Sequence, residues 1–194
     1  MHSNTNENKS HCETVTKLAD QWNFYYFKLD KKKQWIENMN KILTIDSIES
    51  FWGIMHHLKP ISTLNFGSDF YFFRSHIRPM WEDTSNQNGG TWIISSHKSK
   101  RHTELDILWM ELLMFLIGET MDEDSDLICG AAINIRGTND KITVWTSDSS
   151  NLEANRRIGM KLKSILNLHD TIEYISHINN QNKNNSSAKV TLTV

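Results

Sequence analysis

Two tryptophans of this chain stand in polar surroundings, where a residue of the core is not expected. Trp35 follows a run of charged residues at 30–33, and Trp81 precedes the polar stretch 84–90. Core packing is the ordinary interpretation for most of the chain's seven tryptophans. An indole on a polar loop, by contrast, offers a flat face on which another ring can stack. Trp35 and Trp81 are therefore candidates for binding a planar ligand.

A carboxylate and two basic residues could complete a nucleotide site around these rings. Glu82 follows Trp81 directly and could accept two N–H donors from the edge of a guanine. Arg136 and Lys141 flank a predicted turn at 137–140, so both can face one phosphorylated group. A cationic purine between two indoles would gain roughly 1–3 kcal/mol of stacking per face and about 0.5–2 kcal/mol of cation–π attraction. The residue types are consistent with such a site.

Helix start signals and apolar runs predict the elements that would hold these residues. Asp46, Thr103 and Ser150 each precede an acidic residue by three positions, which is typical of a capped helix start. The predicted helices span residues 46–58, 103–118 (with Gly118 as C-cap) and 151–168. The predicted strands span residues 21–29, 41–45, 69–74, 91–96, 128–136, 141–146, 171–177 and 190–194. We predict an α+β fold, a curved antiparallel sheet of about eight strands with three helices packed on its convex face.

Length and composition restrict the class of protein. The chain has 194 residues and a formal charge of −2, which argues against a protein that coats nucleic acid through bulk charge. Two cysteines cannot form a disulfide framework, as is typical of an intracellular, reduced protein. The most apolar stretch, residues 107–117, is too short to span a membrane. We expect a disordered polar tail at 1–15, one domain over 16–194, and a mobile Asn-rich loop at 177–189.

No motif in the chain indicates a metal centre, a cofactor or a catalytic nucleophile. The acidic run at 122–126 lacks the Gly and Glu of a calcium-binding EF-hand, because Leu127 and Ile133 stand at those positions. His56 and His57 have no further ligands at metal spacing. We therefore expect no metal, no cofactor and no enzymatic activity.

Six short motifs occur in a fixed order from about Leu18 to the C-terminus. They are DSIESFW at 46–52, PMWED at 79–83, GGTW at 89–92, LIGE at 116–119, CGA at 129–131 and DKITVW at 140–145. In sequence and spacing they resemble the eukaryotic translation initiation factor 4E family, which binds the cap of messenger RNA. The resemblance implies binding of the 7-methylguanosine 5′ cap and recruitment of an initiation scaffold, in the cytoplasm, with the nucleus as a second location. The alternative is a cap-binding homologue that represses translation through a different partner.

The resemblance also assigns roles to residues of the candidate nucleotide site. Trp35 and Trp81 match the pair that encloses 7-methylguanine, and Glu82 matches the carboxylate that binds the guanine edge. Methylation at N7 makes the ring cationic, so two aromatic faces would prefer the methylated base. The remaining matches are Trp145 beside the N7-methyl group, Arg136 and Lys141 at the triphosphate, and Ser186 near the position of a regulatory phosphoserine.

A second surface is implied on the predicted helices. By the resemblance, a dorsal patch binds partner helices with a Tyr-x4-Leu-hydrophobic motif, from initiation factor 4G-type scaffolds and from 4E-binding repressor proteins. The patch comprises Ile48, Trp52, Met110, Glu111, Met114 and Ile117. Met110, Met114 and Ile117 share one helix face. A lone stripe of this kind more often belongs to a core, but here the opposite stripe, which includes Ile107, can fill it. We expect a monomer.

The chain also departs from the family at several positions. Thr91 stands where the family often has Arg, which removes one charge from the phosphate side. The others are Tyr25 for a Trp, Thr16-Lys17 for the His-Pro that precedes Leu18, and Met110 and Met114 for leucines. Two further alternatives stay open: an enzyme that acts on capped nucleotides, and a general single-strand RNA binder that would ignore N7 methylation.

Overall fold

Eight strands form one open, curved sheet in the computed structural model, which describes residues 15–178 and 189–194. The strands follow the order β2-β1-β3-β5-β6-β4-β7-β8 across the sheet, and every pair is antiparallel. Their bounds are β1 (Lys17–Lys28), β2 (Met39–Ser47), β3 (Ser68–Arg74), β4 (Gly90–His97), β5 (Ile128–Asn134), β6 (Asn139–Thr146), β7 (Glu173–Ser176) and β8 (Leu192–Thr193). The predicted fold class is confirmed.

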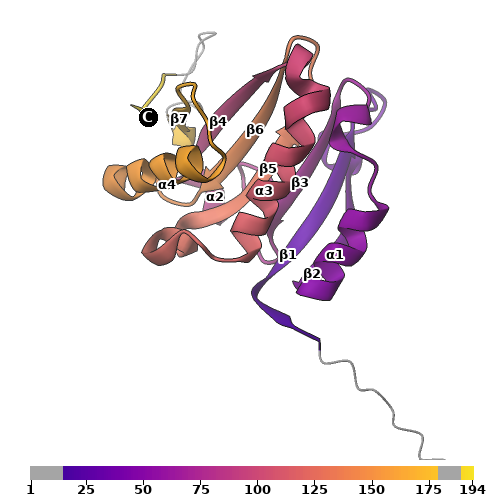
Figure 1. The fold of residues 1–194 in the computed structure, drawn as a ribbon, viewed down its shortest axis with the longest axis horizontal. Coiled ribbons are helices and arrows are strands. Elements are labelled where there is room, and N and C mark those ends of the chain that lie inside the picture. Colours follow the sequence, from indigo (N-terminus) through magenta and orange to yellow (C-terminus); the bar gives the residue numbers. More distant parts are fainter. Residues whose placement is uncertain (1–14, 179–188) are drawn as a thin grey trace, which may run out of the picture.

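Helices cover one face of this sheet (Figure 1). The long ones are α1 (Ile48–His57), α3 (Asp106–Ile117) and α4 (Leu152–Ile165), and a single-turn helix α2 (Thr84–Gln87) precedes β4. Short 3-10 segments η1 (Trp35–Asn38), η2 (Ile61–Thr63), η3 (Lys98–Lys100) and η5 (Asp122–Leu127), and the π-helical segment η4 (Arg101–Leu105), lie in the connections. Among the described residues, none of α1, α3 and α4 contributes to the apolar cluster on the opposite face, which we call the helix-free face.

The residues of the central strands alternate between two apolar layers. In β3, Phe70 and Phe72 belong to the main core with the helices, whereas Tyr71 and Phe73 belong to a smaller cluster. Because successive side chains of a strand point to opposite faces, the smaller cluster lies on the helix-free face. Every residue of β3 is buried, so both faces of this strand are covered.

The main core contains the tryptophans for which core packing is the ordinary interpretation. Trp22, Trp92 and Trp109 are all buried there. The ring of Trp22 stacks on that of Phe72, with centroids 4.9 Å apart. The Nε1–H of Trp92 donates to the backbone oxygen of Asn155 on α4 at 3.1 Å. The first contact joins β1 to β3 within the sheet, and the second joins β4 to α4.

The same alternation brings polar and aromatic side chains to the helix-free face. On β6, Ile142 and Val144 enter the main core, so Lys141, Thr143 and Trp145 point the other way. The predicted pairing of this strand with β5 through a turn is present in the sheet. The predicted hairpin is thus present, but β5 ends at Asn134 rather than at residue 136 and β6 begins at Asn139 rather than at residue 141.

Two helices begin at residues other than the predicted ones. Ser47, not Asp46, caps α1, and Asn151, not Ser150, caps α4. The carboxylate of Asp46 instead accepts from Lys17 of β1 at 2.5 Å. An ion pair between two segments therefore replaces a local cap at this position, because the chain folds back to place β1 beside the start of α1.

The third helix starts later than predicted. Residues 98–105 form the 3-10 segment η3 and the π-helical segment η4. The helix α3 therefore begins at Asp106 rather than at Thr103. The Asp106 carboxylate accepts from the backbone N–H of Ser62 at 3.0 Å and from its hydroxyl at 2.6 Å. This side chain therefore ties η2 to the helix. Gly118 is the C-cap, as predicted.

Parts of the predicted organisation fall on residues that the structure does not describe. The tail at 1–15 lies outside the described residues except for Val15, and Ser186 lies outside them as well. Of the predicted mobile loop, residues 177, 178 and 189 are described. Within the described ranges, no helix is both long enough and apolar enough to cross a membrane.

Candidate functional site

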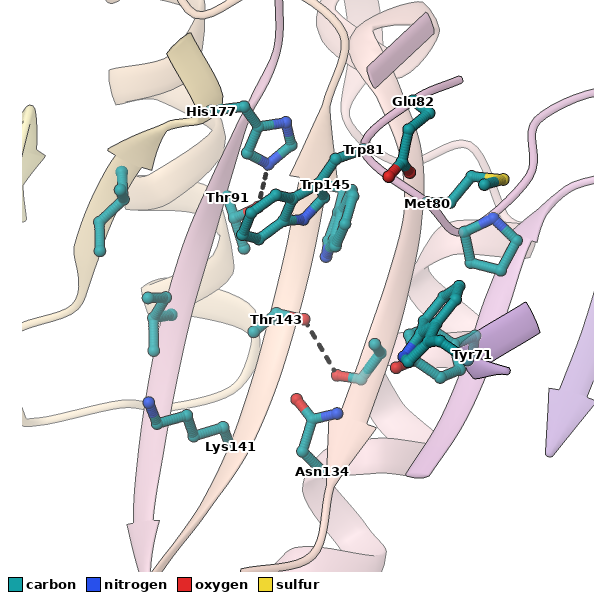
Figure 2. A pocket seen from close by; sticks show the side chains of 15 residues that line it. Tyr71, Met80, Trp81, Glu82, Thr91, Asn134, Lys141, Thr143, Trp145 and His177 are labelled. Atoms are coloured by element: carbon teal, nitrogen blue, oxygen red, sulfur yellow. Dashed lines mark hydrogen bonds between the residues drawn. The ribbon is translucent and has the colours of Figure 1, made fainter. Parts of the chain in front are cut away.

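A cavity of about 420 Å³ opens on the helix-free face of the sheet (Figure 2). We call this cavity the slot. Five predicted site residues line it: Trp35, Trp81, Glu82, Lys141 and Trp145. Its other lining residues are Tyr71, Pro79, Met80, Thr91, Ile93, Ala132, Asn134, Thr143, Ile175 and His177. The structure thus brings together side chains that lie far apart in the sequence.

Trp35 is held at the slot by a network of loop hydrogen bonds. It is the first residue of η1, and its ring lies 5.6 Å from that of the buried Phe27. The buried side chain of Asn38 accepts from the backbone N–H of Asp30 at 2.8 Å and donates to the backbone oxygen of Gln34 at 3.0 Å. These bonds close the loop around the indole. The Trp35 side chain keeps 44% of its surface exposed, which a core tryptophan would not.

The loop that carries Trp81 is anchored by two buried polar side chains. Asp83 caps α2 by accepting from the backbone N–H of Ser85 at 3.0 Å. The amide of Asn86 donates to the backbone oxygens of Arg78 and Met80, at 2.9 and 2.8 Å. Trp81 is likewise 44% exposed. The two predicted indoles are therefore both presented to solvent by rigidly hydrogen-bonded loops.

Glu82 has an available carboxylate. In Figure 2 this side chain lies at the end of the slot that also holds His177. Its backbone oxygen accepts from Gln87 at 3.0 Å, but within the described part of the chain no residue donates a hydrogen bond to its carboxylate. Both oxygens can therefore accept from a ligand, in the bidentate manner that suits a guanine edge.

Trp145 forms part of the slot's inner wall. Only 9% of the residue is exposed, and its ring meets Phe73 edge to face at 5.5 Å. His177 approaches the same indole, with centroids 4.8 Å apart and an interplanar angle of 61°. Trp145 is thus fixed by packing on both sides and can contact only a ligand that enters the slot.

The basic end of the slot differs from the prediction. Lys141 lines it at the end opposite Glu82, near Asn134 (Figure 2). Arg136 is not among the lining residues; its guanidinium donates to both carboxylate oxygens of the buried Asp69, at 2.5 and 3.0 Å. Lys141 and Arg136 therefore differ in the charge that they offer to a ligand, because Asp69 compensates the charge of Arg136.

His177 has no predicted role in the site, because it stands where a predicted strand (171–177) meets a predicted mobile loop (177–189). In the structure this residue is 3% exposed and lines the slot. Its Nδ1 lies 2.7 Å from the backbone oxygen of Asn86, and its Nε2 lies 2.6 Å from Oγ1 of Thr91. A histidine at the end of a predicted strand gave no local signal of this role.

Burial sets the charge of this histidine. Loss of solvent lowers the pKa of His177, although the backbone oxygen of Asn86 opposes the shift. The imidazole is therefore neutral near pH 7. A neutral ring beside Trp81 and Trp145 places no positive charge of its own there, where it would repel a positively charged purine.

The dorsal patch lies on α1 and α3, on the other face of the sheet. Ile48, Trp52 and Met114 are each about two-fifths exposed, whereas Met110, Glu111 and Ile117 are half-buried. The exposed Trp52 packs edge to face on the buried Phe51, with centroids 5.2 Å apart. Its indole is thus supported from below and open above.

Near this patch, one residue departs from the prediction and one contact was not predicted. Ile107, predicted to fill the core, is 58% exposed, because Trp109 and other residues occupy the core side of α3. The backbone N–H of Thr16, which lies ahead of Lys17, donates to both carboxylate oxygens of Glu49 at 3.1 and 3.0 Å. The segment that departs from the family pattern is thus tied to the first turn of α1.

Known proteins resemble this chain over most of its length. Residues 17–191 match the family model described as eukaryotic initiation factor 4E. A eukaryotic translation initiation factor 4E from Aplysia californica is 42% identical over 179 residues, which cover 91% of this chain and 83% of that protein.

Solved structures share the fold. The eIF4E-3 of Ascaris suum, in complex with an m7G cap, has a TM-score of 0.88 and 37% identity, covering 93% of this chain and 98% of that one. A schistosome eIF4E complexed with m7GpppG and 4E-BP has a TM-score of 0.86 and 34% identity, covering 94% and 100%. Both neighbours thus hold a methylated guanine nucleotide, and one of them also holds a partner protein.

Proposed function

The chain belongs to the eukaryotic initiation factor 4E family, and from this premise we propose that it binds the 7-methylguanosine 5′ cap of messenger RNA and recruits an initiation scaffold protein. The observation that carries the proposal is the slot, where two exposed indoles and a carboxylate that accepts no hydrogen bond from the described residues line one cavity. These groups match the chemistry of a cationic guanine. The cap-bound Ascaris and schistosome neighbours support the same ligand.

The base would be recognised by stacking and by charge. Trp35 and Trp81 would enclose the methylated ring, with stacking of about 1–3 kcal/mol per face and a cation–π term that an uncharged guanine lacks. Glu82 would accept from the N1 and N2 donors of the guanine edge. Trp145 would contact the N7-methyl group from the inner wall.

The phosphates would extend towards the basic end of the slot. Lys141 carries an ammonium group that can bind them directly. Arg136 would contribute less as a free charge, because Asp69 holds it in a bidentate ion pair. We therefore assign the larger share of phosphate binding to Lys141.

The dorsal patch would bind the partner. The 4E-BP complex of the schistosome neighbour supports a protein ligand for members of this family, and Trp52 is the exposed aromatic of the patch. Helices with the Tyr-x4-Leu-hydrophobic motif would come from 4G-type scaffolds or from 4E-binding repressors. A repressor role through a different partner is the alternative, and no catalytic step is assigned to the chain. We propose the cytoplasm as the site of action, with the nucleus as a second location.

The deciding experiment is a tryptophan-fluorescence titration with 7-methyl-GTP and, in parallel, with GTP. We expect strong quenching by the methylated nucleotide and far weaker binding of GTP, because only the methylated base is cationic. Equal binding of the two would instead indicate a general nucleotide or RNA binder. Turnover of a cap analogue in the presence of Mg²⁺ or Mn²⁺ would contradict a purely binding role.

A further inference from the structure

We propose that Thr91 and His177 form a specificity-determining pair, in which the Thr91 hydroxyl holds an uncharged His177 imidazole against Trp81 and Trp145 so that the slot favours a cationic base. This inference rests on the proposed cap-binding function and deepens it. The sequence assigns no role in the site to either residue, and Thr91 is noted there only because it replaces an arginine that the family often has.

The hydrogen bonds around His177 determine its tautomer. Nδ1 lies 2.7 Å from the backbone oxygen of Asn86, which can only accept, so Nδ1 carries the proton. Nε2 of the neutral ring is then an acceptor, and the Thr91 hydroxyl donates to it at 2.6 Å. Both ring nitrogens are therefore satisfied in the neutral state, and the backbone N–H of His177 donates to the oxygen of Gly89 at 2.9 Å.

The imidazole lies against two aromatic residues of the base site. Its plane is 21° from that of Trp81, with centroids 6.1 Å apart, and it meets Trp145 at 4.8 Å. A movement of the imidazole would therefore displace Trp81, which would stack on the base, and Trp145, which would contact the methyl group. Because His177 is nearly fully buried, solvent cannot screen a charge placed on it.

The sign of that charge matters for a cationic ligand. An imidazolium at this position would repel a methylated guanine and leave a neutral guanine almost unaffected. The elements packed around His177 carry other ionisable groups: Glu82, Asp83, His97, Asp140, Lys141 and Glu173. These groups are common to all variants discussed below, so a comparison between variants removes their contribution.

Two substitutions of Thr91 distinguish the effect of its hydroxyl group from the effect of its side-chain shape. Thr91→Val keeps the branched form that suits β4 but removes the donor, whereas Thr91→Ser keeps the donor and removes a methyl group. We expect Thr91→Val to lower 7-methyl-GTP affinity by about fivefold, the effect of one lost hydrogen bond, and Thr91→Ser to stay near wild type. The reverse order, with Val normal and Ser weakened, would mean that Thr91 acts through strand packing alone and would overturn the proposal.

The charge of His177 is tested by titration at several pH values. His177→Gln keeps one donor and one acceptor but cannot ionise. We expect the ratio of wild-type to His177→Gln affinity for 7-methyl-GTP to be constant above pH 7. Because burial lowers the pKa of His177, the ratio should fall only at a pH below 6.5, the ordinary pKa of histidine, while the same ratio for GTP should not fall. A ratio that falls equally for both nucleotides, or one that already falls above pH 6.5, where the imidazole should be uncharged, contradicts the proposal.

The same measurements distinguish failure of this inference from failure of the proposed function. Wild-type protein that does not prefer 7-methyl-GTP over GTP at pH 7.5 contradicts the cap-binding function and this inference with it. A normal wild-type preference that is unchanged in Thr91→Val contradicts the inference alone. Circular dichroism of each variant, together with binding of a Tyr-x4-Leu-hydrophobic peptide at the dorsal patch, would confirm that the variants are folded.

Discussion

Glu82 and Lys141 lie at opposite ends of the slot and carry opposite charges (Figure 2). This polarity fits a ligand with a positive base at one end and phosphates at the other. The charge of Glu82 is open to a ligand, whereas the basic residue nearest in sequence to Lys141, Arg136, is already paired with Asp69. At the residue scale, therefore, one substitution should weaken binding of the base and another should weaken binding of the phosphates, each without affecting the other.

We predict that Glu82→Gln lowers 7-methyl-GTP affinity roughly tenfold to a hundredfold, because hydrogen bonds to a charged group contribute about 1.5–3 kcal/mol. Gln keeps one acceptor but presents an NH₂ group to a guanine donor. Fluorescence titration gives the affinity, and Glu153→Gln, an exposed acidic residue on α4, serves as the control. Equal affinities of wild type and Glu82→Gln would exclude the carboxylate from base recognition.

Lys141→Ala should weaken binding of 7-methyl-GTP but leave binding of the nucleoside 7-methylguanosine unchanged. We expect a loss of about fivefold for the triphosphate, since an exposed charge pair contributes at most roughly 1 kcal/mol. Parallel titrations with the two ligands separate phosphate binding from base binding. A similar loss for both ligands would mean that Lys141 shapes the slot instead of binding phosphate.

At the scale of elements, the slot depends on loops and the dorsal patch on helices. Asn38 and Asn86 fix the two loops that carry Trp35 and Trp81. The patch lies on α1 and α3, which pack on the other face of the sheet. Since the sheet stands between the two surfaces, a change at one should not disturb the other.

Trp52→Ala should abolish binding of a peptide with the Tyr-x4-Leu-hydrophobic motif while cap binding persists. Loss of such an interface aromatic commonly costs above about 2 kcal/mol, or more than roughly thirtyfold in affinity. Calorimetric titration with the peptide measures this effect, and Leu152→Ala on α4 is a matched control, because Leu152 is exposed but lies outside the patch. Loss of both activities in Trp52→Ala would indicate misfolding.

At the scale of the whole molecule, one buried arginine connects several distant segments. Arg74, at the end of β3, is bound by the carboxylates of Asp20 and Glu119. It also donates to the backbone oxygens of Ile128 and Ser125, at 2.8 and 2.9 Å. Five hydrogen-bonding N–H groups in a rigid fork allow only arginine to satisfy such a set.

Arg74→Leu is expected to lower the free energy of unfolding by about 3–5 kcal/mol, because two carboxylates lose their buried partner. Arg74→Lys should rescue it only in part, since an ammonium group cannot reach all four acceptors. Urea denaturation measures both variants. Lys17→Ala, which breaks the exposed pair with Asp46, should leave the stability nearly unchanged, and an equally small effect of Arg74→Leu would contradict the role given to Arg74.

The sequence by itself determined the parts of this protein that depend on local pattern. Strand alternation and helix start signals predicted the α+β fold, and the positions of Trp35, Trp81 and Glu82 on polar segments predicted an aromatic site with a carboxylate. The role of these residues can be predicted from their immediate neighbours, because an indole next to charged residues is already unsuited to a core. The matching motifs added Trp145 and the dorsal patch.

Only the tertiary structure decided the rest. His177 reaches Thr91 across 86 positions of the chain, and Asp69 reaches Arg136 across 67. No local pattern predicts such contacts, because they arise from the order in which strands pair in the sheet. Burial also set the charges: His177 is neutral because the fold removes it from solvent, and Arg136 is compensated because Asp69 is buried beside it. Local sequence therefore determined which side chains could form the slot, whereas long-range packing determined the charge of His177 and the pairing of Arg136.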